Sequence, residues 1–276
     1  MTDTQTERLL VSEALVVPSG IQAGHLVVEP SETRRVPGFV ESAFSPLVKA
    51  AVDRCLADVV DGATLGKQGA RTGLVLATLF GDTVTSDLGS RLLESGQTAN
   101  PLLFYQSVPT TILGVIARDY AITGPTTCVA LRGDVRSEAL DLVDTILDDG
   151  MDQVLLIGVE LVTAEGRPLA AHAGLARDGE PLAAPSRTDA AVAFLFRRVE
   201  AAPEAAGAAV PAPAATGAVV PAATADFSAF GSLAGLVQLY ATLRAARAQD
   251  TADAVTLDID SALGARQLRV LLGTAR

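Results

Sequence analysis

Cysteine and histidine are scarce in this sequence. Its 276 residues include only two cysteines, Cys55 and Cys128, and only two histidines, His25 and His172. Two cysteines in a chain of this length do not make a disulfide framework. Neither a CxxC pair nor a His-rich stretch with ligand spacing occurs, so the residues predict no zinc site. A histidine without a nucleophile beside it is also weak support for catalysis.

Positive charge is scarce as well. The chain has 32 acidic and 21 basic residues, which gives a formal net charge of −11. Nucleic-acid binding needs a basic footprint, and adhesion to anionic membranes needs clustered cations, so this charge argues against both. The hydrophobic fraction of 49%, with 19% charged residues, is typical of a folded protein.

Several common motifs are absent. Neither a GxxxxGK nor a GxGxxG phosphate loop occurs, nor a GxSxG nucleophile turn. The first residues, MTDTQTERLLVSEALVV, lack the basic start of a signal peptide. The longest apolar stretch, residues 205–225, contains Pro211, Pro213 and Pro221, which remove backbone donors that a membrane-spanning helix needs. These features predict a cytoplasmic protein with an Ala/Pro-rich linker at 201–226.

Strand and helix patterns alternate along the chain. Continuous apolar runs predict buried strands, and apolar residues at helical spacing predict helices. The predicted strands are residues 9–17, 73–79, 126–131, 154–160, 191–198, 254–260 and 268–275. The predicted helices are residues 44–60, 85–95, a helix from Pro109 to about Gly124, a helix capped by Ser137 that ends near Gly150, and 231–248. Strands separated by helices imply an α/β fold with a mainly parallel sheet.

Several segments, in order, resemble the β-ketoacyl synthases of the thiolase fold. Residues 100–125, NPLLFYQSVPTTILGVIARDYAITGP, resemble the family's NP, then F-x-x-S-V-P, then a helix, then GP. Residues 137–160 resemble the helix behind the family's nucleophile and the strand that follows it. Further likenesses lie at 9–17, 71–96, 187–200, 231–245 and 263–272. The resemblance covers most of the chain and implies a thiolase-like layered α/β fold with mainly parallel sheets and an abbreviated second half.

The resemblance also implies a domain organisation. Residues 1–200 match the N-terminal half of a ketosynthase. The linker at 201–226 stands in for elements of the second half that are missing. Residues 227–276 then form an abbreviated C-terminal half that packs on the first, so we expect one structural domain.

The family's catalytic residues are missing from their expected positions. Gly133 stands where the nucleophilic cysteine would be, and Asp134 follows it. An acidic neighbour opposes the thiolate that a helix N-terminus favours. The family's GH histidine would fall near Ser228 or Ala229, and no histidine follows His172. The sequence therefore implies no catalytic residue, no cofactor and no metal, and no acyl thioester on this chain.

Within the superfamily, the pattern is most similar to chain-length factors, the noncatalytic subunits of type II polyketide synthases. The stretch FYQS at 104–107 is close to their YQS segment, and the shortened form resembles the partner subunits of polyene-type systems. This implies a heterodimer with a catalytic ketosynthase that shapes the acyl-chain tunnel. An acyl carrier protein would dock mainly on the ketosynthase, because acidic carriers and an acidic subunit repel each other. The matching tunnel and interface residues are Phe104, Tyr105, Ser107, Val108, Thr111, Ile112 and Val115.

Two other interpretations remain open. The chain could be a truncated condensing or acyl-transfer enzyme, with Cys128 as nucleophile and His172 as base. Cys128 lies in a predicted buried strand, however, where an apolar setting raises the pKa of a thiol and makes it inert. The chain could also be a homodimeric scaffold that binds acyl chains without a ketosynthase.

Overall fold

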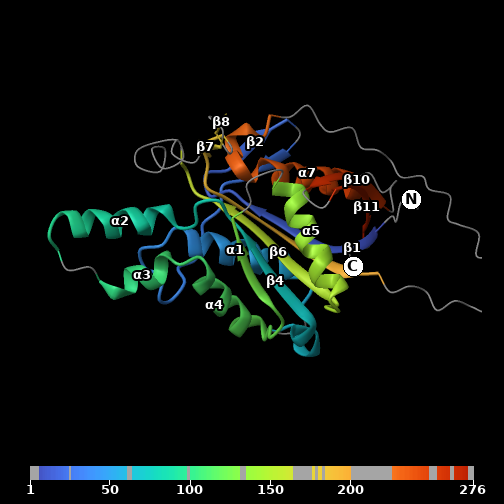
Figure 1. The fold of residues 1–276 in the computed structure, drawn as a ribbon, viewed down its shortest axis with the longest axis horizontal. Helices are drawn as coiled ribbons and strands as arrows, with labels where there is room; N and C mark the ends of the chain where they lie inside the picture. Colours follow the sequence, from blue (N-terminus) through green and yellow to red (C-terminus); the bar gives the residue numbers. More distant parts are fainter. Residues whose placement is uncertain are drawn as a thin grey trace, which may run out of the picture.

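A seven-stranded sheet forms the centre of the protein in the computed structural model (Figure 1). The structure describes residues 6–24, 26–60, 64–97, 100–130, 135–163, 176–177, 180–181, 184–199, 226–248, 254–261 and 264–272. In spatial order the strands are β10 (Ala254–Ser261), β11 (Gly264–Leu272), β1 (Thr6–Val16), β9 (Ala190–Arg198), β6 (Gln153–Glu160), β4 (Thr72–Ala77) and β5 (Thr126–Val129).

Most strands of this sheet run in one direction. Strands β11 and β1 pair in parallel, as do β6 with β4 and β4 with β5. Strand β9 lies antiparallel between β1 and β6, and β10 is antiparallel to β11. Five strands therefore share one direction and two oppose it, which confirms the predicted α/β class with a mostly parallel sheet. Two short antiparallel pairs lie outside this sheet, β2 (Ile21–Ala23) with β3 (Leu26–Val28) and β7 (Ala176–Arg177) with β8 (Glu180–Pro181).

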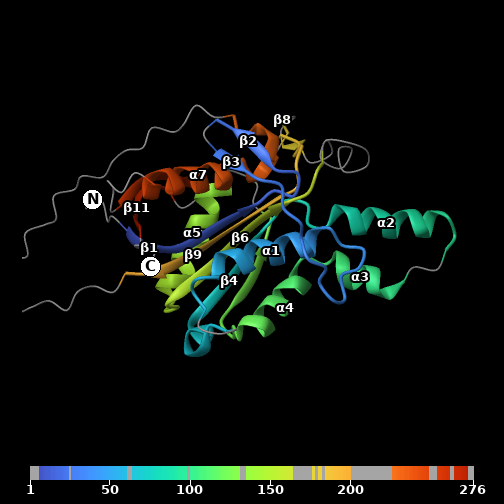
Figure 2. The same cartoon turned by 180° about the vertical axis from the view of Figure 1, so that it is seen from behind.

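Helices cover both faces of the sheet. Helices α5 (Val135–Asp148) and α7 (Ala234–Ala248) lie on one face, and α1 (Phe44–Leu56) and α4 (Thr110–Tyr120) lie on the other (Figures 1 and 2). The buried residues accordingly form two apolar clusters, one on each side of the sheet. The described residues thus form three layers, helix on sheet on helix.

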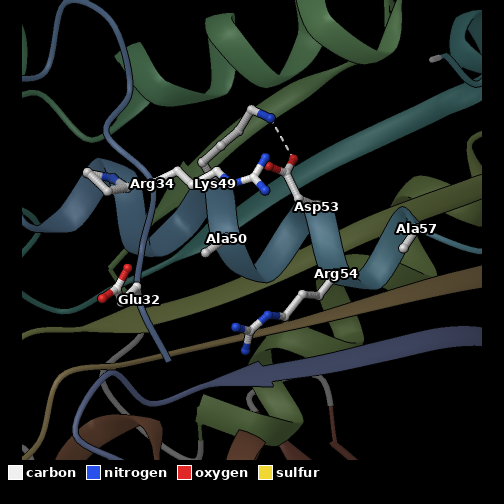
Figure 3. Close-up of a pocket in the computed structure, with 8 residues that line it drawn as sticks. Glu32, Arg34, Lys49, Ala50, Asp53, Arg54 and Ala57 are labelled. Atoms are coloured by element: carbon white, nitrogen blue, oxygen red, sulfur yellow. Dashed lines mark hydrogen bonds and ion pairs between the residues drawn. The ribbon is translucent and has the colours of Figure 1, made fainter. Parts of the chain in front are cut away.

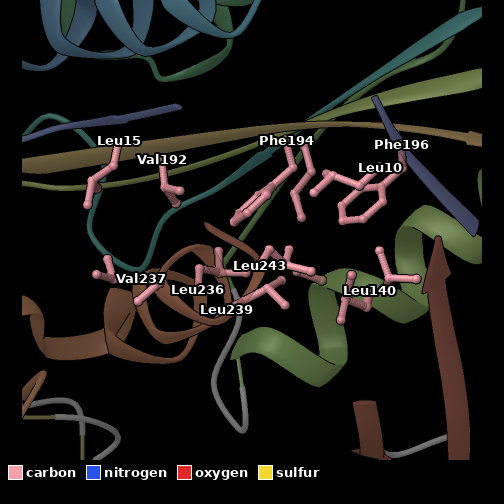
Figure 4. Packing of buried hydrophobic residues seen from close by; sticks show 14 of the residues in the cluster. Leu10, Leu15, Leu140, Val192, Phe194, Phe196, Leu236, Val237, Leu239 and Leu243 are labelled. Carbon is pink, nitrogen blue, oxygen red and sulfur yellow. The ribbon is translucent and has the colours of Figure 1, made fainter. Parts of the chain in front are cut away.

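Alternation along the strands sorts their side chains between the two clusters. Phe194 and Phe196 of β9 face α5 and α7, where Leu236, Leu239 and Leu243 of α7 meet them (Figure 4). The intervening Ala193 and Leu195 face α1 and α4. Because both faces are covered, the central strands read as continuous apolar runs rather than as alternating ones.

Gly158 lets a helical segment approach the sheet closely. A Cβ added at Gly158 of β6 would lie 2.6 Å from Cδ1 of Leu233 and 2.7 Å from Cδ1 of Leu236. Leu233 ends the 3₁₀ helix η2 (Ser228–Leu233), which leads into α7. A second 3₁₀ helix, η1 (Gly66–Arg71), precedes β4. The small residue in VLLIGVE therefore decides how near η2 and α7 come to β6.

The structure differs from the sequence prediction in the burial of one strand and at two helix ends. Strand β5 is only partly buried, because β4 is its single neighbour among the described strands. Ser137 lies buried inside α5, which begins at Val135, so it is not the N-cap. Helix α4 ends at Tyr120 rather than near Gly124, because Ala121 takes a left-handed conformation with φ of 55°.

The predicted linker, apart from its last residue, lies outside the described residues. Within the described part of the chain, no helix has the length and apolar character to cross a membrane.

Candidate functional site

Two helices, which we call the arm, extend beyond the end of the sheet. They are α2 (Thr83–Glu94) and α3 (Pro101–Ser107), and both lie to one side of the three layers (Figures 1 and 2). In α2 only Thr85 is buried, and in α3 only Leu103 and Gln106 are. Helices gain most of their stability from packing an apolar face, so the contacts at the root of the arm determine its position.

A buried carboxylate fixes that root. Asp82 precedes α2, and its side chain accepts hydrogen bonds from the backbone N–H of Thr85 at 2.9 Å and from the Thr85 hydroxyl at 2.8 Å. It also accepts a hydrogen bond from the Ser42 hydroxyl at 2.5 Å. The Ser42 oxygen in turn accepts one from the backbone N–H of Ser45 at 2.9 Å, in the first turn of α1. One side chain thus caps α2 and ties it to α1.

Helix α3 is tied to the loop that precedes α1. The buried Gln106 side chain accepts a hydrogen bond from the backbone N–H of Glu41 at 2.9 Å through Oε1. The rings of Phe39 and Tyr105 lie 5.5 Å apart between centroids, which is within the range of aromatic pairs. The loop and α3 therefore present a joint surface.

Large apolar side chains are exposed on the arm and on this loop. Phe104 of α3 is 77% exposed, and Val40 of the loop is 74% exposed. We call the whole set the arm surface, and it consists of Val40, Val84, Leu93, Leu102, Phe104 and Tyr105. Exposed apolar side chains that gather on one part of a protein are typical of a contact with another protein.

The residues expected at the tunnel and interface fall into three groups. Phe104 and Tyr105 lie on the arm surface. Ser107, Val108 and Thr111 are partly buried around the turn from α3 into α4, and Val115 is partly buried in the middle of α4. The Thr111 hydroxyl lies 2.7 Å from the Val108 carbonyl oxygen and 3.0 Å from that of Tyr105, so it fixes this turn. Ile112 is fully buried in the core between the sheet and α1.

A buried carboxyl group lies where β4 and β6 end. Glu160 is the last residue of β6 and is 3% exposed. Its Oε1 accepts a hydrogen bond from the backbone N–H of Leu79 and lies 3.0 Å from the Ser232 hydroxyl and 3.5 Å from the Thr78 hydroxyl. Burial raises the pKa of Glu160 from 4.5 to about 7, although these hydrogen bonds act in the opposite direction.

A small cavity of about 10 Å³ adjoins this carboxyl group. Its described lining also includes Ala77, Val135 at the start of α5, and Leu233. Such a volume holds one water molecule and is too small for an acyl chain. The second oxygen of Glu160, Oε2, is buried and has no hydrogen-bond partner among the described residues. The cavity therefore has room for a single water beside the carboxyl group.

The nucleophile position and the possible base are not placed by the structure. Gly133, His172 and His25 lie outside the described residues. Cys128 lies on β5, where desolvation raises the pKa of its thiol. Burial raises the pKa of Cys55 to about 12. Both thiols therefore stay protonated at neutral pH, which makes them poor nucleophiles. Within the described ranges, no group of three His, Cys, Asp or Glu side chains is placed to hold a metal ion.

Sequence reasoning missed three polar residues, the buried Glu160 and Asp82 and the partly buried Ser232. Glu160 ends the apolar run VLLIGVE, and a carboxylate at the end of a buried strand was the available signal. Asp82 ends the corresponding stretch after β4, in LATLFGD. Ser232 had no local signal, because only the fold brings η2 beside β6.

Comparison with known proteins gives matches at the level of structure alone. No protein-family model matches the sequence, and no curated protein does either. A β-ketoacyl synthase from Burkholderia phymatum STM815 matches 71% of this chain and 60% of its own, with 14% identity and a TM-score of 0.52. The complex AntDE:AntF, a type II PKS acyl-carrier protein with its ketosynthase bound to the hexaketide, matches 71% of this chain and 59% of its own, with 13% identity and a TM-score of 0.51.

A third match is the ketosynthase ApeO in complex with its chain length factor ApeC, from Xenorhabdus doucetiae. It covers 70% of this chain and 79% of its own, with 14% identity and a TM-score of 0.48. The protein shares its fold with the two matches that have TM-scores above 0.5, and it spans about three fifths of their chains. The protein has a thiolase-like α/β fold. Within that class, its fold is of the β-ketoacyl synthase kind, as the sequence resemblance predicted.

Proposed function

We propose that this chain is a noncatalytic, chain-length-factor-like partner of a ketosynthase in type II polyketide biosynthesis, of the polyene type. The observation that carries the proposal is the arm surface. Phe104 and Tyr105, which the sequence resemblance assigns to the subunit interface, are exposed on a projecting arm that the other described residues leave uncovered. An obligate partner would cover these apolar side chains.

The open edge of the sheet at β5 also supports a contact with a partner chain. Strand β5 follows α4, which in turn follows the arm, and β5 has one neighbour among the described strands. An edge strand presents unpaired backbone N–H and C=O groups that another chain can pair with. A partner that contacts the arm and this edge would extend the sheet.

The absence of a nucleophile supports a noncatalytic role. The sequence has Gly133 at the expected cysteine position, and the thiol of Cys128 is disfavoured as a thiolate by partial burial. No observation favours the alternative enzyme with Cys128 as nucleophile. In the proposed complex, which we place in the cytoplasm, the ketosynthase forms the covalent thioester and provides most of the docking site for the acyl carrier protein.

Association with a ketosynthase tests the proposal directly. We expect the chain, co-expressed with a catalytic ketosynthase from the same polyketide pathway, to elute from size exclusion as a heterodimer. The double variant Leu102→Ser with Phe104→Ser should bind the ketosynthase at least tenfold more weakly, because it removes two exposed apolar side chains from the arm. The control Val27→Ser removes an exposed apolar side chain from β3 and should bind normally. A wild-type chain that ignores the ketosynthase contradicts the proposal.

Control of product length is a separate part of the proposal. Thr111 lies at the turn between α3 and α4, so Thr111→Trp would add bulk beside the arm, and we expect shorter products from the co-expressed pair. Ile112 is less suitable for this test, because a tryptophan there would overpack the core. An unchanged distribution of product lengths with the Thr111 variant would remove this role.

A further inference from the structure

A groove of about 420 Å³ runs beside α1, separate from the arm surface and from the Glu160 cavity (Figure 3). Three cationic side chains line it. Arg34 comes from the extended segment that precedes α1, and Lys49 and Arg54 come from α1 itself. The lining also includes the carboxylates of Glu32 and Asp53, so its three cations and two anions leave one net positive charge, in a chain whose net charge is −11.

One of these cations is neutralised within the groove. Lys49 Nζ lies 2.5 Å from Oδ1 of Asp53 and 3.5 Å from Oδ2 of Asp119. The Tyr120 hydroxyl donates a hydrogen bond to the same oxygen of Asp53 at 2.6 Å. Burial and this hydrogen bond raise the pKa of Tyr120 well above its usual range, so the hydroxyl remains a donor. Asp53 is therefore paired with Lys49 and also accepts a hydrogen bond from the neutral Tyr120 hydroxyl.

The two arginines have no such partner. Neither Arg34 nor Arg54 forms a salt bridge or side-chain hydrogen bond with another described residue. Figure 3 shows Arg34 reaching from the extended segment along α1 toward Asp53, and it shows the guanidinium group of Arg54 turned away from α1 toward the strands beneath it. Glu32 is the other acidic residue among the described lining, and it is exposed to solvent. A guanidinium group presents a planar fork of donors that matches the oxygens of a phosphate.

The remaining wall of the groove is apolar. Pro46, Ala50 and Ala57 lie along α1 between and beside the charged groups. The volume falls within the range of small-molecule sites. We propose that this groove binds a small organic phosphate, with Arg34 and Arg54 holding the phosphate from two sides and the organic part lying against Pro46 and Ala50. The proposal does not depend on a ketosynthase partner.

Calorimetric titration of the purified chain with phenyl phosphate tests the site. At low salt and neutral pH, we expect saturable binding to one site, and weaker binding of inorganic phosphate because it lacks the apolar part. The double variant Arg34→Gln with Arg54→Gln should raise the dissociation constant for phenyl phosphate at least tenfold. Both arginines are exposed, so this variant should keep the wild-type fold, which the unchanged unfolding temperature would verify.

A charge-matched control separates a site from general attraction. Lys67→Gln with Arg91→Gln removes two exposed positive charges that do not line the groove, and it should bind phenyl phosphate as the wild type does. Three results would overturn the proposal: no binding by the wild type, undiminished binding by the Arg34/Arg54 variant, or an equal loss in the control. Inorganic phosphate that binds as tightly as phenyl phosphate would also overturn it, because the apolar wall would then contribute nothing.

Discussion

At the carboxyl end of β6, the two oxygens of Glu160 have unequal surroundings. Oε1 has the Leu79 amide and two hydroxyls close to it, whereas Oε2 has no partner among the described residues. Apart from Glu160, the described residues that line its cavity carry no ionisable side chain. Desolvation is therefore the dominant influence, and it raises the pKa of Glu160 to about 7. The carboxyl group is largely protonated in mildly acidic solution and ionises near neutrality.

This residue predicts how stability changes with pH. The pKa of Glu160 is raised on folding, from 4.5 to about 7, so its contribution is fully present below pH 4.5 and is lost as the pH rises through 7. Glu160→Gln keeps the shape without the charge. We expect the variant to be more stable than the wild type at pH 8, by up to about 3 kcal/mol, and similar to it near pH 4.5. Urea unfolding at both pH values measures the difference.

The control for this prediction is Glu29→Gln, which changes an exposed carboxylate and should leave the pH dependence as it is. If Glu160→Gln loses stability equally with rising pH, the pH dependence comes from other groups, and the buried carboxyl group ionises without cost.

The arm is the element that depends most on a few polar contacts. Helix α2 buries a single side chain and α3 buries two, so apolar packing holds them weakly. The hydrogen bonds of Asp82 and Gln106 therefore contribute much of what keeps the two helices in position. Their partners lie in the loop before α1 and at its first turn. The position of the arm surface therefore follows from the loop and α1, which belong to the well-packed body of the protein.

Removing the cap of α2 should loosen the arm without unfolding the sheet. In Asp82→Ala, α2 loses its N-cap, which costs about 1–2 kcal/mol, and Ser42 loses its acceptor. We expect faster hydrogen exchange in residues 83–94 than in the wild type, with little change in α5. Asp82→Asn keeps a capping oxygen and should exchange at an intermediate rate. Equal exchange rates in α2 for all three proteins would show that other contacts hold the arm.

At the scale of the whole molecule, β1 joins segments from both ends of the described chain. It pairs with β9 on one side and with β11 on the other. Arg247 of α7 donates hydrogen bonds to Glu13 of β1 at 2.5 Å and to the carbonyl oxygen of Leu10 at 2.9 Å. Helix α7 also covers β9 with Leu236 and Leu243 (Figure 4). The residues after 226 therefore complete the sheet and one of its apolar clusters.

A chain that ends at residue 226 should not fold independently. It would expose an edge of β1 and the apolar side chains of β9 that α7 covers, so we expect aggregation or an unfolded chain. The point variant Leu243→Asp should also unfold the protein, whereas Ala248→Asp, at the exposed end of α7, should be tolerated. Circular dichroism with thermal unfolding measures all three. A shortened chain with a cooperative transition near that of the full chain would make the last segment a separate unit.

Much of the fold was accessible from local patterns. The apolar runs that became β4, β6 and β9 are buried on both faces, which is why periodicity alone identified them. The ends of the helices were harder to predict from the sequence. The left-handed Ala121 ends α4 early, and Ser137 lies inside α5, because contacts with other elements override the local signals for caps and turns.

The candidate site was also only partly predictable from the sequence. The segment FYQS was identified from the resemblance, and the structure places Phe104 and Tyr105 on an exposed arm. The sequence did not distinguish them from Ile112, eight residues beyond Phe104, which is fully buried. Phe104 and Tyr105 lie on α3, which projects from the layers, whereas Ile112 lies on the side of α4 that faces the core, and both placements are properties of packing.

By itself, the sequence determined the alternation of strands and helices, the α/β class and the acidic charge, because each depends on composition or on short-range periodicity. The tertiary structure decided the order of the strands, the projection of the arm, the pKa of Glu160 and the gathering of Arg34 and Arg54 beside one groove. Each of these depends on groups far apart in the chain, whose separation and shared exclusion of water are set only when the layers pack together.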